Sequence, residues 1–181
     1  MTLYTGRILG LVLALLVAAV PAGAADAPVR QLEWDDLMPP DWDPLAKLVE
    51  LRDSGALDNI RDGTEDADRI MREFIAAGRS APVVQELDGS RVKLPGFIVP
   101  LDYQGTRVSS FLLVPYFGAC IHVPPPPANQ IVYVKTGKPY DMKQMWDPVW
   151  VTGKMSTKAH YNDLGDAGYT MDAGAIEPYQ E

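Results

Sequence analysis

The sequence has few thiol and few imidazole groups: one cysteine and two histidines among 181 residues. A single cysteine cannot form an internal disulfide, which excludes the disulfide-stabilised class of small secreted domains. Basic residues are also few, with 16 Lys+Arg against 24 Asp+Glu and a net charge of −8. Because phosphate neutralisation drives non-specific nucleic-acid binding, we expect no nucleic-acid partner. The sequence also lacks a phosphate-binding glycine-rich loop, a zincin motif and a Gly-x-Ser-x-Gly elbow.

No apolar run is long enough to cross a bilayer as a helix, which takes about 20 residues. The longest run, residues 8–20, follows Arg7 and precedes Pro21 and the small residues 22–24. This order predicts a cleaved signal peptide over residues 1–24 and a periplasmic protein with no stable membrane insertion after cleavage. An uncleaved N-terminal anchor is the alternative. Without the leader, the net charge is 15 − 24 = −9.

The mature chain is expected to hold one domain, residues 43–181, preceded by a lead-in over residues 25–42. The aromatic and apolar residues Trp34 and Leu37 of the lead-in are predicted to dock onto the domain. Within the domain, periodicity divides a helical part, residues 43–79, from a β part, residues 82–181.

Two helices are predicted, one from Asp43 to about Gly55 and one from Thr64 to Ala77. Aspartate and threonine are good N-caps, and glycine commonly ends a helix. Apolar residues follow each cap at helical spacing, which indicates a face that packs on a core. They are Leu45, Leu48 and Val49 in the first helix, and Ala67, Ile70, Met71, Phe74 and Ile75 in the second.

Short strands with glycine and proline turns are predicted after Pro82. The pair Asp88-Gly89 predicts a hairpin, and Pro95-Gly96 predicts a bend or bulge within a strand. Helices in front of antiparallel strands indicate the α+β class. We therefore expect N-terminal helices packed on a small antiparallel sheet, either curled and open or closed into an OB-like β-barrel. The expected strands cover residues 83–87, 92–101, 108–116, 130–134, 148–155 and 168–173.

The most unusual segment is residues 117–130, Phe-Gly-Ala-Cys-Ile-His-Val-Pro-Pro-Pro-Pro-Ala-Asn-Gln. Cys120 and His122 lie two residues apart in a stretch that proline keeps extended. In an extended chain, residues i and i+2 point to the same face, so the thiol and the imidazole can meet one ion. Sulfur and imidazole nitrogen suit Zn²⁺ or a copper ion. The segment is therefore a candidate metal site.

Two ligands do not complete a structural zinc site, which has about four. His160 is the only other histidine, and the spacing of the sequence selects none of the acidic residues as a further ligand. The carboxylates that can contribute from loops and strand ends are Asp102, Asp141, Asp163, Asp166 and Asp172.

Two other interpretations of the Cys-x-His pair remain open. An imidazolium beside a thiol lowers the thiol pKa and can create a nucleophile, with Asn129 able to orient the histidine. That enzyme would also need an oxyanion site, and an enzymatic role is not the favoured one. Alternatively, Cys120 is a small buried hydrophobe and His122 binds a backbone carbonyl.

The four consecutive prolines support a role in interaction. Pro124, Pro125, Pro126 and Pro127 favour a stiff polyproline II conformation without internal hydrogen bonds. With Asn129 they form a candidate loop for docking an envelope transporter or another periplasmic protein, without any metal. The tryptophans Trp34, Trp42, Trp146 and Trp150 can line a ligand groove, although such residues more often pack at the ends of elements.

Several segments together resemble a family of exported bacterial proteins of unknown function. They are residues 32–39, 94–101, 111–130, 148–153, 169–171 and 176–179, and the segment 117–130 is the most specific. Members are similar to periplasmic or lipoprotein-like components found beside ABC-type transport systems, some of them linked to zinc. The resemblance implies an accessory role in envelope transport or metal handling and no catalytic residues. Because Cys120 is the only cysteine, a lipid-anchored N-terminus is not expected.

Overall fold

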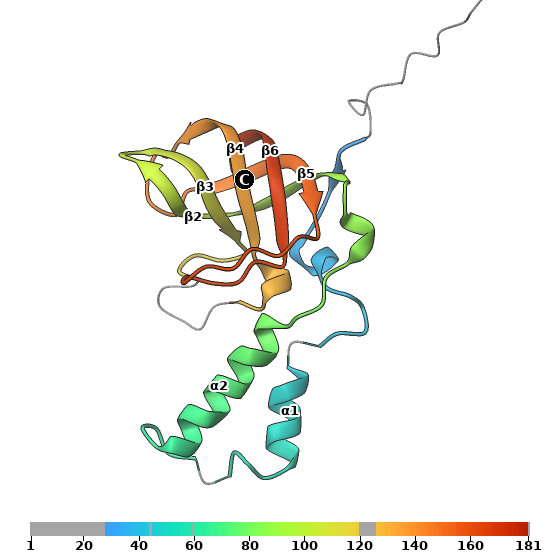
Figure 1. Ribbon diagram of the computed structural model, residues 1–181, viewed down its shortest axis with the longest axis vertical. Helices are drawn as coiled ribbons and strands as arrows, with labels where there is room; N and C mark the ends of the chain where they lie inside the picture. The colour runs from blue at the N-terminus through green and yellow to red at the C-terminus, as the bar shows by residue number, and fades with distance from the viewer. Residues whose placement is uncertain (1–27, 44, 59, 120–125, 181) are drawn as a thin grey trace, which may run out of the picture.

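The computed structural model describes residues 28–43, 45–58, 60–119 and 126–180. A five-stranded β-barrel forms the main body, and a pair of helices extends away from one end of it (Figure 1). The strands lie in the order β1-β2-β3-β4-β6-β5, and a further pairing of β2 with β5 closes the barrel. The elements are β1 (Arg30–Gln31), η1 (Trp34–Leu37), α1 (Ala46–Asp53), α2 (Glu65–Arg79), η2 (Gln85–Leu87), β2 (Arg91–Gln104), β3 (Arg107–Val114), η3 (Ala128–Gln130), β4 (Val132–Asp141), β5 (Pro148–Ser156) and β6 (Tyr169–Pro178).

The sheet is mixed, which corrects the expectation of a purely antiparallel one. β4 and β6 are parallel, with Val132 opposite Tyr169, whereas β5 and β6 are antiparallel. The reason is the order of the strands: β6 lies between β4 and β5 and runs parallel to β4 and antiparallel to β5. A closed barrel with two helices is compatible with the α+β expectation.

Strand β2 is long enough to pair with two neighbours. Its first half pairs with β5 from Arg91 to Phe97, and its second half pairs with β3 from Phe97 to Gln104. A Cβ atom on Gly96 would lie 2.8 Å from the carbonyl oxygen of Val114, so only glycine allows this approach of β3. The ladder of β2 with β5 is continuous through Pro95 and Gly96, so the bulge is wrong there, and the bend, the other expectation for this pair, stays a prediction. The register shifts lie further along β2, between Pro100 and Tyr103.

Residues 83–87 do not form the expected strand. Gln85–Leu87 form a 3₁₀ turn, and Leu87 is buried in the core. The N–H of Val84 donates to the hydroxyl of Tyr169 at 2.6 Å, so a side chain takes the place of a strand partner. The Asp88-Gly89 pair therefore leads from this turn into β2 and does not connect two strands of a hairpin.

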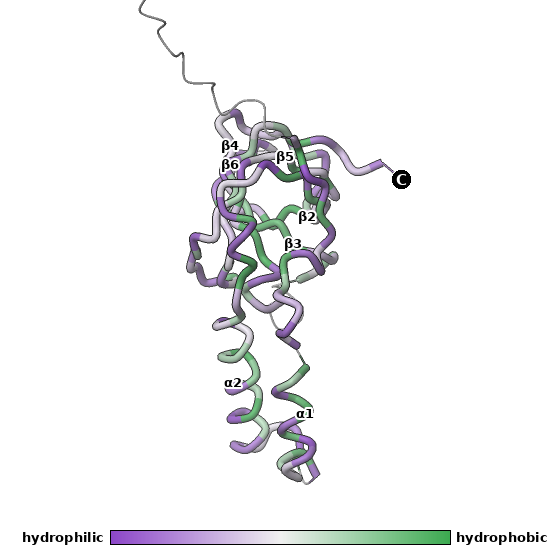
Figure 2. The backbone as a smooth tube through the Cα atoms, turned by 90° about the vertical axis from the view of Figure 1, so that its right-hand side faces the viewer, coloured by the Kyte–Doolittle hydropathy of each residue, from purple (hydrophilic) through white to green (hydrophobic). Residues whose placement is uncertain are grey.

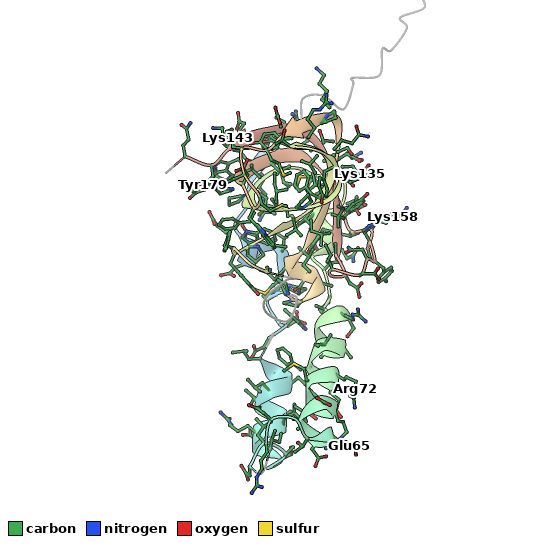
Figure 3. All side chains as sticks on the ribbon, turned by 90° about the vertical axis from the view of Figure 1, so that its left-hand side faces the viewer. Glu65, Arg72, Lys135, Lys143, Lys158 and Tyr179 are labelled. Carbon is green, nitrogen blue, oxygen red and sulfur yellow. The ribbon has the colours of Figure 1, made fainter. Side chains whose placement is uncertain are left out.

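The two helices do not pack on the sheet, which corrects the expected arrangement. They lie beside each other and extend beyond the barrel, and Figure 3 shows Glu65 and Arg72 of α2 far from the labelled lysines of the barrel. Arg79, at the C-terminal end of α2, reaches the barrel through an ion pair with Asp166, with Nε and Oδ2 3.1 Å apart. The helix pair is thus held at its base.

Helix α2 follows the sequence prediction more closely than α1 does. Thr64 caps α2 by accepting the N–H of Ala67 at 3.3 Å, and Ile70 on its apolar face is buried. In α1 only Leu51 is buried. The predicted apolar face of α1 is exposed to solvent, with exposed fractions of 54% for Leu45, 43% for Leu48 and 39% for Val49. Figure 2 shows hydrophobic residues on both projecting helices as well as in β2 and β3.

The lead-in belongs to the barrel from Arg30 onward. β1 pairs in parallel with β2, and the predicted docking of Trp34 and Leu37 is confirmed. Trp34 Nε1 donates to the carbonyl of Pro95 at 2.9 Å, and Leu37 is buried in the same cluster as the barrel interior. Among the described residues, no helix is both long enough and apolar enough to span a membrane.

Tyr169, at the start of β6, connects three parts of the chain inside this core. Its hydroxyl accepts the N–H of Val84 and donates to the carbonyl of Leu37 at 2.8 Å. Burial raises the pKa of Tyr169 to about 12; the Val84 hydrogen bond opposes this shift, and the charge of Glu86 adds to it. The neutral phenol is therefore the form that the fold stabilises.

We expect Tyr169→Phe to lower the free energy of unfolding by roughly 1–3 kcal/mol, because the N–H of Val84 and the carbonyl of Leu37 lose their partner. Because folding raises the pKa of Tyr169, its contribution is complete below the unfolded pKa of about 10 and is lost as pH rises toward 12. Urea unfolding between pH 9 and 12, on the order of one point per half unit, measures both effects. An equally steep alkaline loss in Tyr169→Phe would contradict this assignment.

Candidate functional site

The candidate site residues fall at the edge of what the structure describes. Cys120, His122, Pro124 and Pro125 lie outside the described residues, whereas Pro126, Pro127 and Asn129 lie within them. The chain is described up to Ala119 and again from Pro126 onward, so the elements that flank the candidate site are defined on both sides.

The flank before the site is packed against the outside of the barrel. β3 ends at Val114, and Gly118 adopts a positive φ of 82°, a conformation that glycine takes without strain. The N–H of Ala119 donates to the carbonyl of Tyr116 at 3.5 Å, and Ala119 is fully buried. Ala119 packs in a second apolar cluster with Val99 and Leu112, which lies apart from the cluster in the barrel interior.

The flank after the site is held by several hydrogen bonds. Pro126 is buried and Pro127 is half-buried. The side-chain amide of Asn129 donates to the backbone carbonyl of Pro82 at 2.9 Å. The side-chain amide of Gln130 donates to the backbone carbonyl of Trp34 at 2.8 Å. These bonds connect the flank to the end of the α2 segment and to the lead-in. Both ends of the candidate segment are therefore fixed to the rest of the fold.

Asn129 also presents an unused acceptor. Its side chain is fully buried, and its Oδ1 atom has no hydrogen-bond partner. The bond from Nδ2 to Pro82 fixes which end of the amide is the oxygen. Because nearly all buried polar atoms in proteins are paired, such an oxygen indicates a donor that arrives with a ligand, a water molecule or another part of the chain.

An aromatic cluster beside the first flank was missed by the sequence analysis. The ring of Phe117 lies 6.2 Å from that of Phe97 in an edge-to-face arrangement and 5.7 Å from that of Trp146. Phe117 is nevertheless 67% exposed. Trp146 has a φ of 65°, a conformation that is costly for a bulky residue and frequent at functional positions. Only the aromatic residues themselves signalled this cluster, because no spacing rule connects them.

The buried carboxylate of Asp147 stabilises the turn that carries Trp146. Its two oxygens accept the N–H groups of Lys143 at 2.5 Å and Gln144 at 3.1 Å. Asp147 is thus a structural residue, which the sequence analysis did not identify.

Most of the further ligands considered from the sequence have other partners, and Asp163 lies exposed in a turn. The ring of His160 stacks on Tyr133 with the centroids 3.6 Å apart, and its backbone bonds to Ala167. Asp166 is paired with Arg79. Within the described ranges, no three His, Cys, Asp or Glu side chains are grouped to hold a metal ion. The remaining carboxylates with contacts are Asp102 with Ser109, Asp141 with Thr106, and Asp172 with Lys135.

Comparison with known proteins places the chain in a family. Residues 34–178 match the family model described as "Protein of unknown function (DUF3299)". The chain belongs to the DUF3299 family. The match spans both flanks of the candidate segment and the helix pair, so the barrel and the projecting helices are parts of one family unit.

Solved structures include a member of the DUF3299 family from Pseudomonas aeruginosa PAO1. It is 40% identical to this chain, with a TM-score of 0.64, and the match covers 86% of this chain and 99% of that one. An OBody in complex with hen egg-white lysozyme also matches, at 18% identity and a TM-score of 0.34, over 54% of this chain and 89% of that one. No curated protein matches the chain.

Proposed function

We propose that this DUF3299 protein is an exported accessory protein that binds a transition metal, zinc or copper, in connection with an envelope transporter. Cys120 and His122 are the proposed ligands, and the barrel, which we propose to be of the OB type, is their support. The observation that carries the proposal is the anchoring of both flanks of the Cys-x-His segment: Ala119 is buried in an apolar cluster, and Asn129 and Gln130 are hydrogen-bonded to distant parts of the chain. Anchored ends lower the entropy cost of closing a short segment around an ion.

Asn129 supports the same proposal in another way. A histidine that binds a metal through one ring nitrogen usually donates the other N–H to a neighbouring oxygen. The buried, unpaired Oδ1 of Asn129 offers such an acceptor seven residues after His122. In this proposal Asn129 is a positioning residue, since it contacts the histidine and not the ion.

Residues 117–128 hold no other metal-binding side chain, so the other ligands of the ion then come from solvent or from the partner to which the metal is passed. A site with free coordination positions is the kind needed for transfer, whereas a closed four-ligand site retains its metal. An accessory role in handling metal fits such an open site better than a structural zinc site does.

Metal titration tests the proposal. We expect the purified protein to bind one Zn²⁺ or Cu⁺ per chain in competition with a chromophoric chelator. Cys120→Ser and His122→Asn should each weaken binding by more than about tenfold. Even the loss of a residue that only supports a metal ligand typically lowers metal affinity by at least about that factor. The matched control is His160→Asn, which removes the only other histidine and should leave the affinity unchanged.

Two substitutions of Asn129 distinguish a role in positioning His122 from a merely structural role. Asn129→Asp keeps an acceptor for the imidazole, whereas Asn129→Leu removes it, and both variants lose the donor to Pro82. We expect both variants to lower the melting temperature to a similar extent. Only Asn129→Leu should also weaken metal binding. An affinity that is insensitive to Cys120→Ser, or the absence of binding by the unaltered protein, would refute the metal site.

Cell fractionation followed by mass spectrometry of the intact protein tests export and cleavage. The proposal requires cleavage after Ala24, so a chain that begins at Ala25 should be released with the periplasmic fraction of a Gram-negative host. Replacing Leu13 by Arg within the apolar run should retain the full-length precursor inside the cell. A full-length protein found with the membranes would instead indicate an uncleaved anchor.

A further inference from the structure

A cavity of about 190 Å³ lies where the helix pair meets the barrel. Four separate parts of the chain form its walls: the start of α1, the C-terminal half of α2, residues 126–128 and Asp166. Because these parts are far apart in the sequence, the cavity exists only in the complete fold. None of the described residues that line it is a proposed metal ligand.

The walls of the cavity are mostly apolar. Trp42 and Phe74 supply aromatic surface, and Ile75 and Pro127 supply aliphatic surface. Trp42, Phe74, Ile75 and Pro127 are each only half-buried. A concave apolar space at the junction of two structural parts is the typical setting of a small-molecule site.

The charged groups at the rim already have partners. Arg79 pairs with Asp166 at 3.1 Å, and Lys47 pairs with Glu50 at 3.1 Å. The carboxylate of Asp43 accepts the N–H of Leu45 at 2.8 Å. A ligand that brought a charge into this cavity would lose its hydration without gaining an opposite charge, which is costly. The electrostatics of the rim therefore match an uncharged ligand.

The volume limits the size of the ligand. Sites for drug-sized molecules are about 300–1,000 Å³, larger than this cavity. An apolar cavity of about 150 Å³ in another protein binds benzene, which is close in size. We propose that the cavity binds a small, uncharged, apolar molecule of about the size of one six-membered ring. Because such a ligand contacts α1, α2 and residue Pro127 together, its binding also stabilises the helix pair against the barrel.

Three probes of similar size and different charge test the proposal on the unaltered protein. They are benzyl alcohol, benzoate and benzylamine, titrated by NMR with the indole N–H of Trp42 and the methyl groups of Ile75 as reporters. We expect saturable shifts of both reporters with benzyl alcohol, and affinities at least about tenfold weaker for the two charged probes. Equal affinity for all three probes, or shifts that do not saturate or avoid these reporters, would overturn the proposal.

Glycine substitutions provide a matched pair of variants. A Cβ atom on Gly78 would lie 3.5 Å from Cα of Pro127, an ordinary contact, so the further carbons of Gly78→Leu would crowd the junction that the ligand would fill. A Cβ atom on Gly137 of β4 would meet nothing within 4 Å, and Gly137→Leu is the control. Gly78→Leu should abolish saturation by benzyl alcohol and Gly137→Leu should preserve it. Gly78→Ala, which also favours the helix, should weaken binding and covers the case in which Gly78→Leu does not fold.

Discussion

Closure of the barrel through β2 is the constraint on which the rest of the structure depends. One strand pairs with β5 along its first half and with β3 along its second half, and the two ladders meet at Phe97. Gly96 permits the close approach of β3 at this point. Closure surrounds the buried apolar cluster with paired strands, and it leaves no long unpaired edge between β2 and β5.

Closure also determines where the Cys-x-His segment is held. The segment follows β3 and precedes β4, two strands that are neighbours in the barrel. Its first flank ends in the buried Ala119, and its second flank is bonded to Pro82 and Trp34. Segments from the lead-in, from the end of the helical part and from the barrel therefore meet at one place. This convergence makes the segment the best candidate for function.

The sequence predicted features that depend on neighbouring residues. Thr64 as a cap and the docking of Trp34 and Leu37 both follow from local patterns, and the structure agrees with them. The prediction failed where distant residues decide the outcome. Residues 83–87 form no strand: Gln85–Leu87 form a 3₁₀ turn, and the N–H of Val84 bonds to the hydroxyl of the distant Tyr169. The apolar face of α1 is exposed because the helix pair extends beyond the barrel, which no local pattern reveals.

The candidate site shows the same division. The Cys-x-His pair and the four prolines were visible in the sequence, because their spacing alone indicates an extended stretch with two ligands on one face. The unpaired oxygen of Asn129 and the cluster around Phe117 required the three-dimensional structure. An unpaired acceptor can be identified only after every nearby donor has been placed. Phe117 and Trp146 are separated in the sequence by the whole of β4, so no local pattern connects them.

The account depends most on direct coordination of the ion by Cys120 and His122. X-ray absorption at the zinc edge of the metal-loaded protein measures this without any substitution. The account predicts a scattering shell of one sulfur at about 2.3 Å together with nitrogen at about 2.0–2.1 Å. A spectrum fitted by oxygen and nitrogen alone, with no sulfur, would contradict it.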